Sequence, residues 1–170
     1  AALCATSRYS IMTGNNNYRS AFPWGVWSGY AKSAISKEQL TLGRAMKKAN
    51  YNTAFFGKWH LGTSFSTKND ANKVFVATRK KTSLNVDITK IKDFGPNQTG
   101  FDYSVTLPSG IQNEPYSVYE NDIWLPLKKD SEIALIDNVY MQSIGSEMEK
   151  KTGLGDSNWL PSKIGPLLAD

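Results

Sequence analysis

The chain has 170 residues, 40% of them hydrophobic and 21% charged, which suits one globular domain with a real core. No apolar run approaches the ~20 residues of a membrane-spanning helix, and the single cysteine excludes an internal disulfide framework. The formal charge of +5 favours anionic partners in general, among them nucleic acid, anionic polysaccharide and sulfated small molecules.

The first expected element is a short helix near the start of the chain. Residues 4–14 predict a turn into a helix that Thr6 or Ser7 would cap and Gly14 would end. A long loop over residues 15–27 follows. The aromatic side chains in and just after this loop are expected to pack against the core rather than line a substrate pocket; they are Trp24, Trp27 and Tyr30.

A second helix and a strand come next. Residues 36–39 have the pattern of a capping box, with Gln three residues after Ser. The helix after it is expected to stop near Asn50 and to bury one face, made of Leu42, Ala45, Met46 and Ala49. An aromatic-rich strand over residues 53–59 follows a tight turn. Helix, turn and apolar strand are typical of an α/β protein.

The remainder of the chain is less regular. Residues 63–100 are rich in Lys, Asn, Thr and Ser, and we interpret them as a variable excursion from the central sheet, with strand-like pieces at 73–77 and 83–88. Order resumes at Gly100, with a strand at 116–119. The pattern is weak from 128 to 162, where loops are expected at Gly153, Gly155 and Pro161.

A cysteine and an arginine lie at the start of the first helix. Cys4, just before the helix, faces the positive end of the helix dipole and its free N–H groups. Arg8 returns to the same side one turn later. This pattern indicates an anion site with a position for a nucleophile. The alternative is a buried, inert thiol beside a surface arginine. Cysteine phosphatases are excluded, because they place more residues between Cys and Arg.

A lysine and the only histidine lie at the end of the expected strand. Because side chains alternate along a strand, Lys58 and His60 are expected on the same side, about 7 Å apart. An amine and an imidazole that converge there suit anion binding and proton transfer. The alternative is a solvated lysine beside a histidine that caps the sheet.

Together the two clusters resemble the paired signatures of the sulfatase family, in its arylsulfatase-like branch. Residues 4–8, CATSR, with the Thr-Gly at 13–14, resemble the first signature, and residues 51–62, YNTAFFGKWHLG, resemble the second. Position 6 is Thr, where the commonest signature has Pro and another version has Ala. The likeness covers residues 2–62 well and residues 94–122 more loosely. On these motifs the chain is identified as an internal fragment of a sulfatase.

The resemblance implies a reaction at Cys4. A maturation enzyme would oxidise Cys4 to formylglycine, and one hydroxyl of its hydrate would displace the alcohol of a sulfate ester. The second hydroxyl, which serine lacks, would then lose a proton and expel sulfate. By the same resemblance Arg8 would hold the hydrate, Lys58 would bind the hydrate and sulfate, and His60 would orient the hydrate and take the proton. The expected catalytic residues are these four.

The resemblance also implies a divalent cation, usually Ca2+, bound by oxygen ligands. Cys4, as formylglycine, would be one ligand, and the remaining ligands are expected outside this chain. Asp137-Asn138 has the residue types of a ligand pair but comes too early in the sequence. A second His and a second Lys that protonate the leaving group are also expected elsewhere. We therefore expect this chain alone to bind metal poorly and to be inactive.

The implied fold is α/β, with an alkaline-phosphatase-like central sheet flanked by helices, in an incomplete domain. Residues 1–62 would form the core with both motifs, 63–100 the excursion, and 101–170 a truncated continuation. The chain begins without Met or a leader and ends inside an expected helix, so we expect both ends to be cuts in a longer chain. A periplasmic, secreted or lysosomal location is implied by the resemblance alone.

The implied enzyme is a sulfuric ester hydrolase acting on a sulfated glycan or an aryl sulfate. Two alternatives from the same superfamily stay open: a phosphoester or phosphonate hydrolase, and a non-catalytic anion-binding relative in which Cys4 remains a thiol. A nucleic-acid-binding module is disfavoured, because the basic residues are scattered and not gathered on one helix or sheet face.

Overall fold

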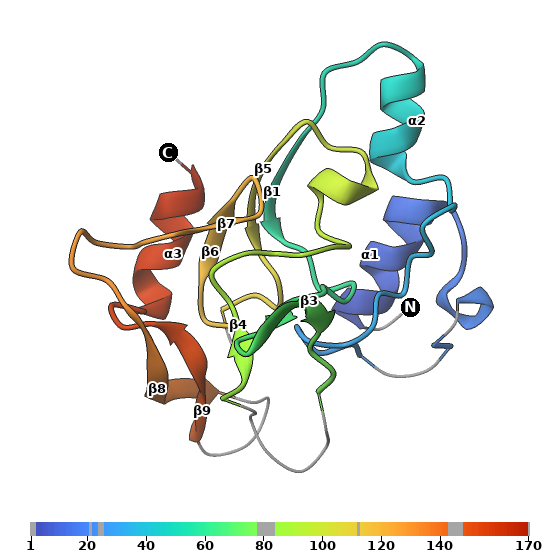
Figure 1. Cartoon of the computed structure of the whole chain (residues 1–170). Coiled ribbons are helices and arrows are strands. Elements are labelled where there is room, and N and C mark those ends of the chain that lie inside the picture. The colour runs from blue at the N-terminus through green and yellow to red at the C-terminus, as the bar shows by residue number, and fades with distance from the viewer. Residues whose placement is uncertain are drawn as a thin grey trace.

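The computed structural model of the chain describes residues 3–20, 22–23, 26–77, 84–111, 113–142 and 148–169. It has a mixed α/β architecture in which a central sheet lies between helices (Figure 1). None of the helices in these ranges is long and apolar enough to cross a membrane.

The central sheet has four strands in the order β1-β5-β6-β7. Their bounds are Ala54–Lys58, Tyr103–Leu107, Val118–Glu120 and Ile123–Leu125. β1 and β5 are parallel, whereas the β5-β6 and β6-β7 pairs are antiparallel. The strand predicted over residues 53–59 is confirmed as β1, and the one predicted at 116–119 is found two residues later as β6.

Helices cover both faces of this sheet. Phe55 of β1 packs against the cluster that contains residues of α1 (Cys4–Thr13), and Val105 of β5 packs against the cluster that contains Ile164 of α3 (Pro161–Ala169). Phe55 is paired with Ser104 in the parallel register. Since neighbouring residues of a strand point to opposite faces, Phe55 and Val105 lie on opposite faces. The sheet therefore separates α1 from α3.

Helix α1 forms because one of its faces is apolar. Ala5, Tyr9 and Met12 are spaced four and three residues apart, and all three are buried in the core. Gly14 ends the helix with a φ of 69° and donates its N–H to the Ser10 carbonyl at 2.8 Å. The predicted end at Gly14 is confirmed, whereas the predicted N-terminal caps are wrong, because the N-cap residue is Leu3. The hydroxyls that were expected to cap, those of Thr6 and Ser7, instead donate to the Leu3 carbonyl.

Helix α2 (Leu42–Lys48) begins later than its predicted capping box. Residues 36–39 form a turn, and Thr41 caps the helix by accepting the Arg44 N–H at 3.3 Å. The predicted buried face is also wrong, because Leu42 and Met46 are each 40% exposed. Gly43 is buried instead, where a Cβ would come within 2.9 Å of the Gly100 carbonyl carbon. The close approach of the Gly43 and Gly100 backbones, and not an apolar stripe, therefore determines how this helix packs.

The described residues between 63 and 100 build a separate small sheet and one short helical turn. The sheet has the order β3-β2-β4, with bounds Asp70–Val74, Ser66–Thr67 and Val86–Asp87. β3 and β4 overlap the strand-like pieces predicted at 73–77 and 83–88, whereas β2 was not predicted, and residues 78–83 lie outside the described ranges. The helical turn of this segment is η2 (Asn97–Thr99), whereas the 3-10 turn η1 (Asn17–Arg19) lies in the loop after α1.

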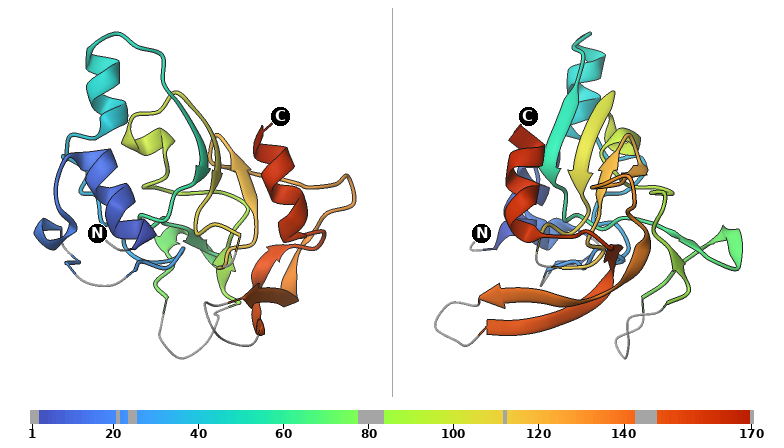
Figure 2. Two further views of the ribbon diagram at one scale, coloured as in Figure 1. Left: turned by 180° about the vertical axis from the view of Figure 1, so that it is seen from behind. Right: turned by 90° about the vertical axis from the view of Figure 1, so that its left-hand side faces the viewer.

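The predicted loops at Gly153 and Gly155 are wrong, because both glycines lie in a hairpin of β8 (Ile133–Gln142) and β9 (Met148–Asp156). A Cβ on Gly155 would come within 2.5 Å of Tyr116. Glycine in this strand therefore allows a close approach and does not mark a turn. The hairpin and the tip of the small sheet project from the central sheet in different directions (Figure 2).

Candidate active site

The four predicted site residues come together where α1 begins and β1 ends. Lys58 Nζ donates to Cys4 Sγ at 3.6 Å, and His60 Nδ1 lies 3.6 Å from the same sulfur. Arg8 Nη1 donates to the Lys58 carbonyl at 2.6 Å, which ties α1 to the end of β1. The side chains of Lys58 and His60, at the end of β1, thus both contact the sulfur of Cys4 on α1.

Helix α1 presents Cys4 at its positive end. Cys4 is the first helical residue, and the preceding Leu3 is extended. The first intrahelical bond of the backbone runs from Ser7 N–H to the Leu3 carbonyl, so the N–H groups of residues 4–6 have no acceptor within the helix. Cys4 is exposed. An anionic atom at this position would meet backbone donors, the helix dipole and a lysine together.

Arg8 adds a further donor. The Nε atom of Arg8 is buried and has no hydrogen-bond partner among the described residues, while Nη1 is used by the Lys58 carbonyl. A guanidinium presents its donors as a rigid fork, so fixing one arm also fixes the direction of the others. The remaining donor capacity suits an oxyanion that approaches this side of α1.

His60 reaches Cys4 through an unusual backbone conformation. Strand β1 ends at Lys58, and His60 has a φ of 60°, so strand alternation does not account for the convergence of the two side chains. Trp59 and Leu61 on either side are fully buried, and the His60 N–H donates to the Pro108 carbonyl at 2.9 Å. Buried neighbours of this kind hold a residue in a left-handed conformation that costs about 1 kcal/mol or more.

The surroundings of His60 keep its imidazole neutral. The side chain is buried, and desolvation lowers the pKa of His60 from 6.5 to about 4, with further lowering by the charges of Lys58 and Arg8. A hydrogen bond to the backbone of Trp27 opposes this effect. At neutral pH the ring therefore has an unprotonated nitrogen that can accept a proton.

This environment predicts an unusual titration for the only histidine of the chain. We expect NMR of the uniformly 15N-labelled, tag-free protein to show the imidazole nitrogens titrating with a midpoint near pH 4. Assignment is unambiguous because no other imidazole is present. A midpoint near the unperturbed value of about 6.5 would mean that the ring is solvated and not held against Cys4.

Gly110 makes room for the lysine, and no feature of the sequence singles it out. Its φ is +87°, and a Cβ at this position would come within 2.8 Å of Lys58 Cδ and 3.1 Å of Lys58 Cε. Contacts this short force a shift, and the flexible lysine side chain is the group that can move. Gly110 therefore keeps the Lys58 amine directed at Cys4.

Replacing Gly110 with alanine tests this role. We expect Gly110→Ala to displace Lys58 and raise the pKa of His60 above that of the unmodified protein, because the Lys58 charge lowers it. Gly14→Ala is the matched control: its φ is +69° and its Cβ would meet no atom within 4 Å. Both changes carry a left-handed strain of about 1 kcal/mol. An equal His60 midpoint in the two variants would contradict the role.

The described residues do not form a calcium site. They contain no group of three or more His, Cys, Asp or Glu that could hold a metal ion. The described contacts to Cys4 come from the nitrogens of Lys58 and His60, whereas Ca2+ prefers oxygen ligands. The side chain of Asp137 lies outside the described residues. The part of the site carried by this segment is cationic, and it does not fit calcium by itself.

Two of the three aromatic residues in and after the loop belong to the core, as predicted. Trp27 and Tyr30 are buried in two different hydrophobic clusters, and Trp24 lies outside the described residues. Tyr9 and Trp27 pack with their ring centroids 6.1 Å apart. This packing holds the loop whose backbone contacts His60.

Comparison with known proteins decides the family, since a family model named Sulfatase matches residues 1–151. The chain belongs to the sulfatase family. An arylsulfatase of Hemicentrotus pulcherrimus is 36% identical over 77 residues, which cover 41% of this chain and 13% of that protein. The steryl-sulfatase of Homo sapiens is 32% identical over 119 residues, covering 64% of this chain and 20% of that protein.

Bacterial relatives of this sulfatase chain extend the comparison. An N-acetylgalactosamine-6-O-sulfatase of Bacteroides thetaiotaomicron is 28% identical over 127 residues, 71% of this chain and 20% of that protein. A solved structure concerning the metabolism of multiple glycosaminoglycans by the same organism matches 85% of this chain and 26% of its own, with a TM-score of 0.56 and 22% identity. This likeness confirms the α/β, alkaline-phosphatase-like fold. The chain spans 13% to 20% of these three curated relatives.

Proposed function

We propose that this segment carries the nucleophile half of a sulfatase active site, in a protein that hydrolyses sulfate esters. The observation that carries the proposal is the convergence of Lys58 Nζ and His60 Nδ1 on Cys4 Sγ, each at 3.6 Å. One lysine, one neutral histidine and a helix start around one reactive position provide anion binding and proton transfer at the same point. Membership of the sulfatase family makes sulfate the expected anion.

The cationic groups would act on the sulfate oxygens. Lys58 and the Arg8 guanidinium would balance the negative charge that builds up on the sulfuryl group, together with the N–H groups at the start of α1. Their positions are set before substrate arrives, because Arg8 is bonded to the Lys58 backbone and Gly110 leaves the space that the lysine side chain occupies. Preorganised donors of this kind typically contribute about 3 kcal/mol each to transition-state stabilisation.

Neutral His60 would act as a general base. Its low pKa keeps the ring unprotonated at neutral pH, so it can take a proton from a hydroxyl at the position of the Cys4 sulfur. Its buried position excludes bulk water from the receiving nitrogen. The backbone contact with Trp27 fixes the direction of the ring.

The expected modification of Cys4 to formylglycine fits this environment. The Cys4 side chain is exposed, which allows a maturation enzyme to reach it, and it has one donor and one acceptor-capable nitrogen beside it. As formylglycine hydrate the residue would supply two hydroxyls on one carbon, one to attack sulfur and one to release sulfate. Lys58 and His60 are placed to hold such a pair.

The substrate proposed is a sulfated glycan, with an aryl sulfate as a simple surrogate. The named relative that acts on N-acetylgalactosamine 6-sulfate groups supports a sugar, whereas the steryl and aryl relatives support other alcohols. We also propose that a divalent cation is held by carboxylates from outside this segment. The division of the chain into the motif-bearing core of residues 1–62, the excursion and the continuation stays part of this proposal.

Two measurements test the function. The first compares hydrolysis of para-nitrophenyl sulfate with that of para-nitrophenyl phosphate by the full-length protein, and a clear preference for sulfate is expected. Faster phosphate hydrolysis would assign the phosphoester alternative. The second is peptide mass spectrometry across residues 1–19, in which formylglycine makes the peptide lighter than the thiol form. An entirely unmodified Cys4 together with no turnover would assign the non-catalytic alternative.

A further inference from the structure

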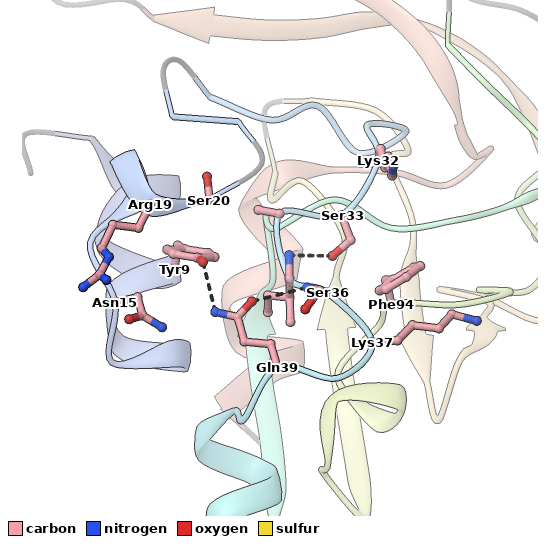
Figure 3. Close-up of a pocket in the computed structure, with 12 residues that line it drawn as sticks. Tyr9, Asn15, Arg19, Ser20, Lys32, Ser33, Ser36, Lys37, Gln39 and Phe94 are labelled. Carbon is pink, nitrogen blue, oxygen red and sulfur yellow. Dashed lines mark hydrogen bonds between the residues drawn. The ribbon is translucent and has the colours of Figure 1, made fainter.

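A cavity lies away from Cys4. It has a volume of about 600 Å³ and opens between α1, the loop over residues 32–39 and Phe94 (Figure 3). None of the four candidate catalytic residues lines it. Tyr9 on its wall follows Cys4 by five residues, which is about 7.5 Å along the helix axis and on another side of the helix. The cavity is therefore separate from the candidate active site, although the same helix borders both.

The charged residues that line this cavity have one sign. Arg19, Lys32 and Lys37 line it, and no Asp or Glu is among its lining residues. Lys37 forms an ion pair with Asp93 at 3.0 Å. Arg19 and Lys32 are exposed, and neither takes part in an ion pair with another described residue. Figure 3 shows Arg19 at the α1 end of the cavity and Lys32 at the opposite end. Two uncompensated cations thus flank the space.

The polar groups between these cations still have protons to donate. The hydroxyl of Ser20 accepts the Phe22 N–H at 3.1 Å, and the hydroxyl of Ser33 accepts the Ile35 N–H at 3.0 Å. The Tyr9 hydroxyl accepts a hydrogen bond from Gln39 Nε2 at 3.0 Å, drawn as a dashed line in Figure 3. A hydroxyl that accepts one bond retains its own O–H as a donor. The backbone bonds therefore orient these hydroxyls while leaving their protons for a ligand.

We propose that this cavity binds a sulfate group of a sulfated glycan, at a site separate from Cys4. A sulfate ester carries no proton at neutral pH and only accepts hydrogen bonds, so it matches a lining that offers donors and no carboxylate. Arg19 and Lys32 attract its charge from the two ends of the cavity, and the lining hydroxyls beside the bound group donate to its oxygens. The choice of sulfate among oxyanions rests on the proposed function, whereas the preference for an anion rests on the cavity alone.

The test measures binding after the candidate active site has been disabled. Lys58→Ala removes the lysine at Cys4, and isothermal titration calorimetry at low ionic strength then follows three probes: a dextran sulfate oligosaccharide, unsulfated dextran of the same length, and inorganic sulfate. We expect the sulfated oligosaccharide to bind and the unsulfated one not to bind. Weak binding of inorganic sulfate at the same site would identify the free ion as a second source of the same chemistry.

The cavity residues are then changed in the same background. Arg19→Ala with Lys32→Ala is expected to weaken binding of the sulfated oligosaccharide by about tenfold or more, since both uncompensated positive charges of the cavity are lost. Lys128→Ala with Lys129→Ala is the matched control, because it removes the same charge from exposed residues outside the cavity. Circular dichroism melts establish that both variants are folded.

Two outcomes overturn the proposal. Equal affinities in the cavity variant and the control would mean that only net charge attracts the oligosaccharide. Complete loss of binding in Lys58→Ala alone would mean that Cys4 marks the sole anion site. Turnover of para-nitrophenyl sulfate is measured separately, on the full-length protein with Lys58 intact. Neither of the two binding outcomes therefore contradicts the proposed hydrolase activity. Conversely, a protein that shows no turnover can still show whether the cavity binds the sulfated oligosaccharide.

Discussion

Replacing Cys4 with serine is expected to reduce hydrolysis of para-nitrophenyl sulfate by the full-length protein by about four orders of magnitude or more. Serine retains one oxygen nucleophile at the start of α1, beside Lys58 and His60. It lacks the second hydroxyl that would release sulfate from the same carbon. A single slow turnover followed by arrest is therefore the expected time course.

The structure predicts that this variant still folds and binds sulfate. Cys4 is exposed and lies outside the hydrophobic clusters, so exchanging sulfur for oxygen leaves the core unchanged. Ser10→Ala is a suitable control on the same helix, because the Ser10 hydroxyl contacts only the Thr6 carbonyl among the described residues. Its rate should stay within about twofold of the parent. Multiple turnovers by Cys4→Ser would remove Cys4 from the reaction.

The features that the sequence located best are those carried by its two motifs. A cysteine and arginine one helical turn apart, and a lysine and histidine at a strand end, predicted one site through their joint resemblance to the paired sulfatase signatures. The reason given for the second pair was incomplete, since His60 reaches the sulfur from a left-handed backbone and not from a continuing strand. Periodicity describes only regular backbone, so it cannot foresee a residue with positive φ.

The features that were missed depend on contacts between distant segments. The expected buried face of α2 followed from the spacing of Leu42 and Met46, yet close approach of Gly43 to Gly100 decides how this helix packs. Gly155 was interpreted as a loop residue, although it lies in β9 against Tyr116. Gly110 was not singled out at all. In each case a glycine is needed because another segment occupies the space of a Cβ, and one sequence does not show which segment that is.

Replacing Lys58 with alanine is expected to lower kcat for sulfate-ester hydrolysis by about 10²- to 10³-fold, the usual loss when one preorganised charge donor is removed. The amine lies 3.6 Å from the reactive position, and the backbone beside it is held by Arg8. Lys48→Ala supplies the control, since this exposed cation lies on α2, away from the site. A loss confined to KM would mean that Lys58 only attracts substrate.

The pH profile distinguishes a catalytic lysine from a merely structural one. The Lys58 charge lowers the pKa of His60, so removing it should raise that pKa from about 4, while desolvation, the larger cause, keeps it below the ordinary value of 6.5. If neutral His60 takes the proton, activity falls as pH drops through this pKa, and the acidic limb should move to higher pH in Lys58→Ala. Lys58→Arg keeps the positive charge, so the acidic limb of its pH profile should stay in place. Its rate can still be lower, because the larger arginine side chain must fit against Gly110. If Lys58→Ala is slower but its acidic limb does not shift, then the Lys58 charge does not affect the pKa of His60. That result would contradict a single site at Cys4 shared by the two side chains.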